Sequence, residues 1–275
     1  MKCARHWLDC PSSLTHGNMI QRVIFTREDP ENPGVEGAVM RNIESFARAY
    51  LEPGVSSVPH VNEGIQETFF VVDGDGILVA DDGERPVREG NGIYVPPEVK
   101  HTFINNGEKP LEFIIVVEAV PNGAEVEAKT ALISNYRENP MGIGHWKFLD
   151  RAVFAGTPNE LIHDRKNRMV QRHAILVVVM DPMQTSDSHP HTTDKDEIWY
   201  MLKGEGVHVV GEEMVIHKPG MAIQVAPCSP GHTLINHTHE PLMAFYIAAA
   251  VYRVEDDGSY TRVLEPLPGS RTAKS

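Results

Sequence analysis

Residues 54–74 read GVSSVPHVNEGIQETFFVVDG, and the order of polar residues in this stretch recurs later in the chain. The first set is His60, Asn62, Glu67 and His101, and the second set is His189, His191, Glu197 and His232. The offset between the sets is 129 positions at the first histidine, 130 at the glutamate and 131 at the last histidine. Such a nearly constant offset indicates that the chain is a tandem duplication.

Composition limits the kinds of partner that the chain is expected to bind. The 275 residues are 41% apolar and 23% charged, which is typical of a globular protein. The net charge of -13 would repel phosphate groups. We therefore expect no nucleic acid and no anionic membrane as partner, and we expect a small-molecule substrate.

Cysteine usage and the lack of a long apolar segment predict a cytoplasmic protein. Cys3, Cys10 and Cys228 are too few for a disulfide framework, and Cys228 is expected to be an ordinary loop residue. The N-terminal residues MKCARHWLDCPSS include no apolar signal core. The longest apolar run, Leu242 to Tyr252, is too short to cross a bilayer.

Short apolar or alternating runs separated by Gly-containing turns predict β-strands throughout both halves. Examples are residues 68–72, 76–80 and 92–95 in the first half and 197–202 and 222–225 in the second. We expect an N-terminal domain over residues 1–125, a linker and packing segment over 126–165, and a C-terminal domain over 166–275. A helix is expected near Val126 to Tyr136.

The spacing within each set predicts that its side chains converge on one metal ion. His189 and His191 lie two apart, as do His60 and Asn62, so in an extended strand both side chains leave the same face. Glu197 opens the next strand, and His232 follows a proline-containing turn. Imidazole and carboxylate donors together suit a divalent transition metal such as Fe, Mn, Ni, Zn or Cu.

These motifs resemble those of the cupin superfamily. The first motif matches as Gly54, His60, Asn62, Glu67 and Gly74, the second matches as Gly90, Pro96, His101 and Asn105, and both recur in the later half. The chain is therefore similar to a bicupin. The resemblance implies an all-β fold of two tandem antiparallel jelly-roll barrels, a divalent metal inside, and a homodimer.

The resemblance assigns metal ligation to two sets of residues. The primary site is His189, His191, Glu197 and His232, and the second, weaker site is His60, Asn62, Glu67 and His101. Asn62 stands where the family has a second histidine. Because an amide oxygen is a weaker donor than imidazole, the first site should bind metal less tightly or not at all.

Two further residues are candidates for the substrate pocket, although no catalytic residue is identified. Trp199 alternates with Glu197 along its strand and should point the same way. Gln224 is an amide on the strand before His232, and a buried amide needs partners.

The leading functional hypothesis is a metal-dependent enzyme acting on a small chelating organic molecule at the C-terminal site. Four protein ligands leave an octahedral ion two open positions. Dioxygenase chemistry is favoured from the breadth of the family. The alternatives are isomerase, decarboxylase or lyase chemistry on a sugar acid or carboxylate, and a non-catalytic bicupin that binds a sugar or acid.

Overall fold

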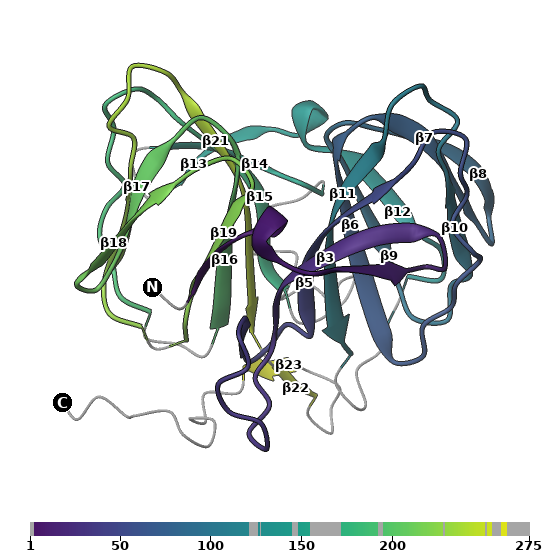
Figure 1. The fold of residues 1–275 in the computed structure, drawn as a ribbon, viewed down its shortest axis with the longest axis horizontal. Helices are drawn as coiled ribbons and strands as arrows, with labels where there is room; N and C mark the ends of the chain where they lie inside the picture. Colours follow the sequence, from purple (N-terminus) through teal and green to yellow (C-terminus); the bar gives the residue numbers. More distant parts are fainter. Residues whose placement is uncertain are drawn as a thin grey trace.

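The computed structural model describes residues 3–120, 126, 128–144, 148–154, 172–191, 195–227, 229–250, 252–254 and 260–262. These residues form two β-rich units that lie side by side (Figure 1), which we call the N-terminal and C-terminal units. Each unit has one large and one small sheet. The prediction of an all-β fold with two tandem jelly-roll units is confirmed.

The large sheet of the N-terminal unit has the strand order β12-β9-β6-β11-β5-β3-β2, with β4 beside β3, and the small sheet has the order β10-β7-β8. Apart from the β3–β4 pair, these strands pair antiparallel. The strands are β2 (Ser12–Thr15), β3 (Met19–Arg27), β4 (Ala38–Met40), β5 (Ser45–Leu51), β6 (Ile65–Asp73), β7 (Asp75–Ala80), β8 (Gly83–Arg88), β9 (Asn91–Val95), β10 (His101–Ile104), β11 (Leu111–Ala119) and β12 (Leu132–Asn135).

The C-terminal unit repeats this arrangement, with a large sheet β1-β19-β16-β21-β15-β14-β13 and a small sheet β18-β17-β20. A separate two-stranded sheet joins β22 to β23. The strands are β1 (Ala4–His6), β13 (Met141–Gly144), β14 (Phe148–Ala152), β15 (Arg172–Met180), β16 (Lys195–Lys203), β17 (Gly206–Val210), β18 (Glu213–His217), β19 (Met221–Val225), β20 (His232–Ile235), β21 (Leu242–Ala250), β22 (Tyr252–Val254) and β23 (Tyr260–Arg262). Two short 3-10 helices are η1 (Trp7–Asp9) and η2 (Tyr136–Glu138).

The two repeats exchange their first strands. β1 begins the chain but pairs with β19 of the C-terminal unit, whereas β12, its equivalent in the second repeat, pairs with β9 of the N-terminal unit. β13 and β14 belong to the C-terminal large sheet. Strand pairing therefore crosses the boundaries expected at residues 125 and 165, and each unit uses a strand from the other repeat.

The prediction of a helix near Val126 to Tyr136 is wrong. Leu132 and Ile133 instead lie in β12, paired with Tyr94 and Ile93 of β9, and η2 follows. The local sequence is rich in helix-forming residues. Pairing with an open sheet edge supplies hydrogen bonds and burial that outweigh this weak local preference.

Buried apolar residues form three clusters that explain how the sheets pack. One cluster fills the N-terminal unit between its two sheets and includes Phe69, Phe103 and Phe113. A second fills the C-terminal unit and includes Trp199 and Leu234. The third joins the large sheets of the two units back to back. Its members include Phe46, Phe70, Tyr94, Ile175, Tyr200 and Phe245.

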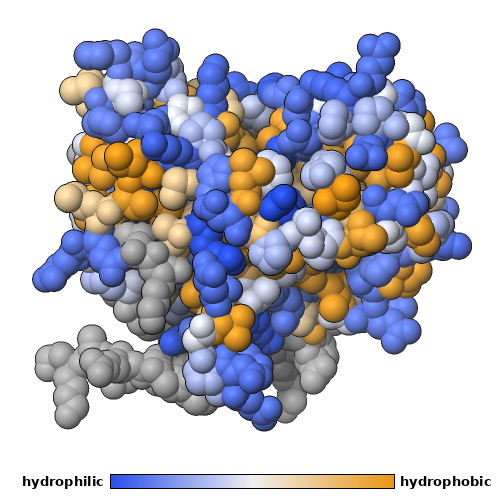
Figure 2. Space-filling view, in the orientation of Figure 1, coloured by the Kyte–Doolittle hydropathy of each residue, from blue (hydrophilic) through white to orange (hydrophobic). Residues whose placement is uncertain are grey.

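The surface mixes polar and apolar side chains (Figure 2). Apolar surface lies over β17 and β18, and Met214 and Ile216 of β18 are 73% and 49% exposed. Among the described residues, no helix is long and apolar enough to span a membrane. The expected homodimer stays a prediction.

Candidate metal centres

Both units bring the first and last histidine of each motif set together by the same backbone contact. The amide of His60 donates to the carbonyl of His101 at 2.8 Å, and the reverse bond is 2.9 Å. His189 and His232 exchange the corresponding bonds at 3.3 and 3.1 Å. Residues directly opposite each other in an antiparallel bridge project their side chains to the same face, so each pair of imidazoles is held in one place.

The C-terminal unit brings together all four residues of the predicted primary site. His189, His191 and His232 each offer a ring nitrogen, and these nitrogens lie within 4.8 Å of one another. Glu197 lies at the start of β16, with its two carboxylate oxygens each 3.0 Å from Nε2 of His191 or His232. Glu197, His191 and His232 are buried. The arrangement is one that could hold a divalent ion.

Two neutral donors fix the Glu197 carboxylate. Trp199 Nε1 donates to Oε1 at 2.6 Å, and the Tyr246 hydroxyl donates to Oε2 at 2.9 Å. Burial raises the pKa of Glu197, but the adjacent imidazoles of His191 and His232 outweigh it and hold that pKa well below its usual range. Burial, followed by the charge of Glu197, raises the pKa of Tyr246 well above its usual value. The carboxylate therefore stays ionised and the phenol stays a donor.

One lysine lies at the edge of this cluster. The ammonium of Lys195 is 3.8 Å from Glu197 Oε2, and the lysine side chain is 16% exposed. Burial lowers the pKa of His191, so its imidazole is neutral near pH 7 and keeps a nitrogen lone pair. The site thus combines neutral nitrogen donors, one carboxylate and one nearby cation.

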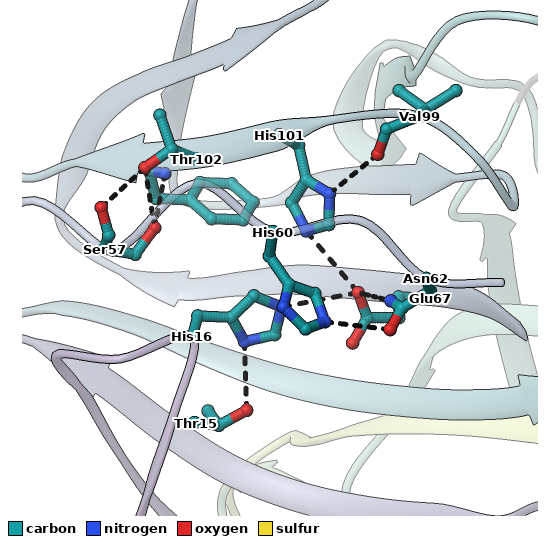
Figure 3. A network of polar contacts seen from close by, with 10 residues as sticks. Thr15, His16, Ser57, His60, Asn62, Glu67, Val99, His101 and Thr102 are labelled. Carbon is teal, nitrogen blue, oxygen red and sulfur yellow. Dashed lines mark hydrogen bonds and ion pairs between the residues drawn. The ribbon is translucent and has the colours of Figure 1, made fainter.

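The N-terminal unit brings its predicted residues together in a different way (Figure 3). Nε2 of His60 lies 2.8 Å from Asn62 Oδ1, and Nδ2 of Asn62 donates to Glu67 Oε2 at 2.6 Å. His60 and Asn62 therefore contact each other rather than presenting two free donors. Burial raises the pKa of Glu67, but the hydrogen bond and charge of His16 outweigh it and lower that pKa overall.

His16 is a site residue that the sequence analysis missed. Its Nε2 lies 3.4 Å from Glu67 Oε2, the same distance as Nε2 of His101 from that oxygen. His16, Glu67 and His101 are all buried and offer ligand atoms within 4.8 Å of one another. Burial lowers the pKa of His101 to about 4. A signal was present in the sequence, because His16-Gly17 is a turn dipeptide between two strand-like runs, but it lies far from either motif.

A model of the cupin domain matches residues 47–117 and 176–248, which together span more than half of the chain. The chain belongs to the cupin family. Both matched segments contain the glutamate and the last histidine of their motif set, whereas His16 lies outside them.

Individual relatives resemble this cupin chain over limited segments or at low identity. An uncharacterized protein of Methanocaldococcus jannaschii is 25% identical over 105 residues, which cover 34% of this chain and 84% of that protein. The oxalate-binding protein of Thermotoga maritima is 31% identical over 72 residues, or 26% of this chain and 60% of that protein. The structure of a mutant of Bacillus subtilis oxalate decarboxylase OxdC superposes with a TM-score of 0.65 at 15% identity, covering 95% of this chain and 79% of that one.

The interiors of the two cupin units differ in polarity at equivalent positions. In the small sheets, His208 pairs with Leu234 just as Leu78 pairs with Phe103. Both ring nitrogens of His208 and Nδ1 of His217 are buried without a hydrogen-bond partner among the described residues. At equivalent positions of the two repeats, the C-terminal unit has His208 where the N-terminal unit has Leu78, and His217 where it has Val87. Only the C-terminal unit therefore places polar groups behind its metal cluster at these two positions.

Aromatic side chains fill the corresponding region of the N-terminal cupin unit. The ring centroids of Phe69, Phe103 and Phe113 lie between 4.7 and 5.8 Å from one another. The C-terminal unit has smaller side chains at two of these positions and an indole at the third. At these positions Trp199 replaces Phe69, Leu234 replaces Phe103 and Ala244 replaces Phe113.

The structure corrects the assignment of Gln224 to the substrate pocket. Its Nε2 lies 3.3 Å from both the carbonyl of Val39 and Oδ1 of Asp196, on the face of the sheet turned toward the N-terminal unit. Alternation along β19 places Ile223 and Val225 on the opposite face, where Val225 is part of the core of the unit. Trp199 does contact Glu197. Cys228 lies outside the described residues.

Proposed function

We propose that the C-terminal cupin unit is a metal-dependent catalytic site for a small carboxylate that chelates the ion. The observation that carries this proposal is the convergence of His189, His191 and His232 beside the Glu197 carboxylate. The Lys195 ammonium at the edge of the cluster adds a contact suited to an anionic substrate.

The residues present fit a divalent transition metal. Two metal–nitrogen bonds of about 2.1 Å span up to roughly 4.2 Å, so nitrogens within 4.8 Å need only small adjustments to share one ion. The contacts from Trp199 and Tyr246 to Glu197 are of the kind that orients a ligating carboxylate. When bound, such an ion supplies Lewis-acid polarisation of substrate oxygens.

The side chains around the ion have distinct expected roles. His189, His191, Glu197 and His232 would hold the metal and leave two of six coordination positions for substrate. Lys195 would pair with a carboxylate of the substrate and fix its orientation. The buried Trp199 indole excludes water from one side of Glu197 while holding its oxygen in place.

Lyase chemistry, with cleavage of a carbon–carbon bond next to a carboxylate, is our preferred reaction class. It is supported by the lysine and by similarity to an oxalate-binding protein and, at the level of fold, to an oxalate decarboxylase. For the dioxygenase chemistry favoured from the sequence, neither a described residue nor a reported relative gives similar support. A second candidate function is metal-dependent carboxylate binding without turnover, which the oxalate-binding relative favours.

The test loads the purified chain with Mn, Fe, Ni, Zn or Cu in turn and adds oxalate, malonate or glyoxylate. We expect carboxylate binding by calorimetry and product release without stoichiometric consumption of dioxygen. Consumption of one dioxygen per product would support the dioxygenase, and binding without product would support the second candidate. Absence of both metal and carboxylate binding would refute the proposal.

Lys195 offers a matched pair of variants. Lys195→Ile installs the residue that the N-terminal unit has at the equivalent position, Ile65. Loss of one charge-assisted contact should weaken carboxylate binding about tenfold to hundredfold. Metal content should stay unchanged. Lys203→Ile, on the exposed end of the same strand, is the control and should bind carboxylate like the wild type.

A further inference from the structure

We propose that the N-terminal unit holds a second metal ion, with His16, Glu67 and His101 as its ligands. His16 would supply the imidazole that Asn62 cannot. This inference goes beyond the proposed function, which concerns only the C-terminal unit. It also differs from the ligand set predicted by the motifs, because His60 and Asn62 become supporting residues.

The distances around Glu67 favour an ion over simple hydrogen bonding. Nε2 of His16 and Nε2 of His101 both lie 3.4 Å from the same carboxylate oxygen, Oε2. This is longer than the preferred hydrogen-bond length. Two ligand atoms at right angles around an ion, each about 2.1 Å away, are roughly 3.0 Å apart. Two imidazoles and one carboxylate are a known donor set for divalent iron and its neighbours.

Each histidine has a polar contact at Nδ1, while its Nε2 lies near Glu67. The carbonyl of Val99 lies 3.2 Å from Nδ1 of His101, so this nitrogen carries the proton and Nε2 presents its lone pair (Figure 3). Nε2 of His101 is buried without a hydrogen-bond partner among the residues described. Thr15 Oγ1 lies 3.0 Å from Nδ1 of His16, and a hydroxyl at this distance is able to accept the proton of that nitrogen. Such outer contacts are typical of metal-ligating histidines.

Asn62 and His60 occupy the supporting positions. Asn62 donates to Glu67 Oε2 at 2.6 Å and holds the carboxylate, while its own oxygen contacts Nε2 of His60 at 2.8 Å. Nε2 of His60 is therefore directed at the amide. The His16 ring lies beside the His60 ring, with their centroids 4.5 Å apart.

Contacts of the β2–β3 turn fix the position of His16. His16 has φ 47° at the β2–β3 turn, a left-handed conformation that non-glycine residues adopt at a cost. Its carbonyl accepts from the amide of Val58 at 2.8 Å. A Cβ on Gly17 would lie 2.2 Å from Val58 Cγ2, so only glycine permits this approach. Asn18 also donates to the carbonyl of Ser56 at 3.0 Å.

A histidine also recurs at this position of the repeat. His145 follows His16 by 129 positions, the offset that separates His60 from His189. His145 lies outside the described residues. The recurrence indicates that a histidine before the second hairpin strand belonged to the ancestral unit rather than arising at one turn by chance.

The experiment isolates the N-terminal site and compares two single substitutions. In a His189→Ala/His191→Ala background, which removes two imidazoles of the other site, the chain is titrated with Co²⁺ and its bound metal is counted by elemental analysis. We expect one Co²⁺ per chain. His16→Asn should weaken binding on the order of a hundredfold, because loss of a ligand should cost at least as much as loss of an outer contact. His60→Asn should weaken it about tenfold or less.

Asparagine is chosen at position 16 because it tolerates the left-handed turn, so the hairpin can keep its shape. Unchanged circular dichroism and melting temperature of the metal-free variant test this point. His6→Asn, in the same N-terminal segment, is the control and should bind like the background. The proposal is overturned if the background binds no Co²⁺, or if His60→Asn abolishes binding while His16→Asn does not. Neither result depends on catalysis in the C-terminal unit.

Discussion

Replacing the buried His217 by valine should make the protein less sensitive to acid. His217 is buried in the C-terminal unit, and only its Nε2 has a partner among the described residues, the carbonyl of Met221 at 3.1 Å. The N-terminal unit has Val87 at the equivalent position. Valine is therefore a residue that this fold accepts there.

The magnitude follows from the pKa of the imidazole. Burial lowers the pKa of His217 from 6.5 to about 4, so the unfolded chain takes up a proton in a pH range where the folded chain does not. Stability from this group is present above pH 6.5 and is lost as the pH falls toward 4. At pH 5 the wild type should have lost about 2 kcal/mol relative to pH 7.5 through this group. The variant lacks this loss.

The assay is urea unfolding of the metal-free protein, with a chelator present, at pH 7.5 and pH 5. At pH 7.5 the variant should be within about 1 kcal/mol of the wild type, since it loses one hydrogen bond but buries an apolar side chain. At pH 5 it should gain about 2 kcal/mol relative to the wild type. His237→Val, which removes a 44% exposed imidazole, is the control and should keep the wild-type response. Equal acid sensitivity of His217→Val and the wild type would refute the reasoning.

Three other substitutions test separate contacts. Trp199→Phe removes the 2.6 Å hydrogen bond to Glu197 and should weaken metal binding at the C-terminal site about tenfold to hundredfold in a chelator competition. Gly17→Ala places a Cβ 2.2 Å from Val58 Cγ2 at φ 73° and should destabilise the protein by about 1–3 kcal/mol in urea unfolding. Asp196→Ala leaves two backbone N–H groups of the N-terminal unit, now bonded at 2.5 and 2.8 Å, without an acceptor, and should cost about 2–4 kcal/mol by the same assay.

The sequence predicted the duplicated all-β fold because the signals for strands and turns are local and recur with a fixed offset. It failed for residues 126–136, where the deciding interaction is pairing between β12 and the edge strand β9. It also did not predict that β1 pairs with β19, more than 200 residues away. No local pattern encodes which sheet edge a short strand will join.

Local patterns also explain why four residues of the C-terminal site were predicted and why His16 was missed. His189, His191, Glu197 and His232 lie within two compact motifs, and the structure brings them together. His16 reaches the other site through a long-range contact, 51 residues from Glu67. The contact joins the β2–β3 turn to β6, two elements that are not neighbours in the large sheet, and no motif spacing predicts that they meet.

Comparison of the two units also explains why we place catalysis in the later one. Both units share the same backbone bridge between metal-site histidines, so the frame does not distinguish them. Burial of His208 and His217 without full hydrogen bonding costs free energy, whereas Leu78 and Val87 at the equivalent positions carry no such cost. Since the fold tolerates apolar residues there, structural need does not account for the two histidines. We infer that these two imidazoles serve the proposed carboxylate site, whereas the N-terminal unit has apolar side chains at the same positions.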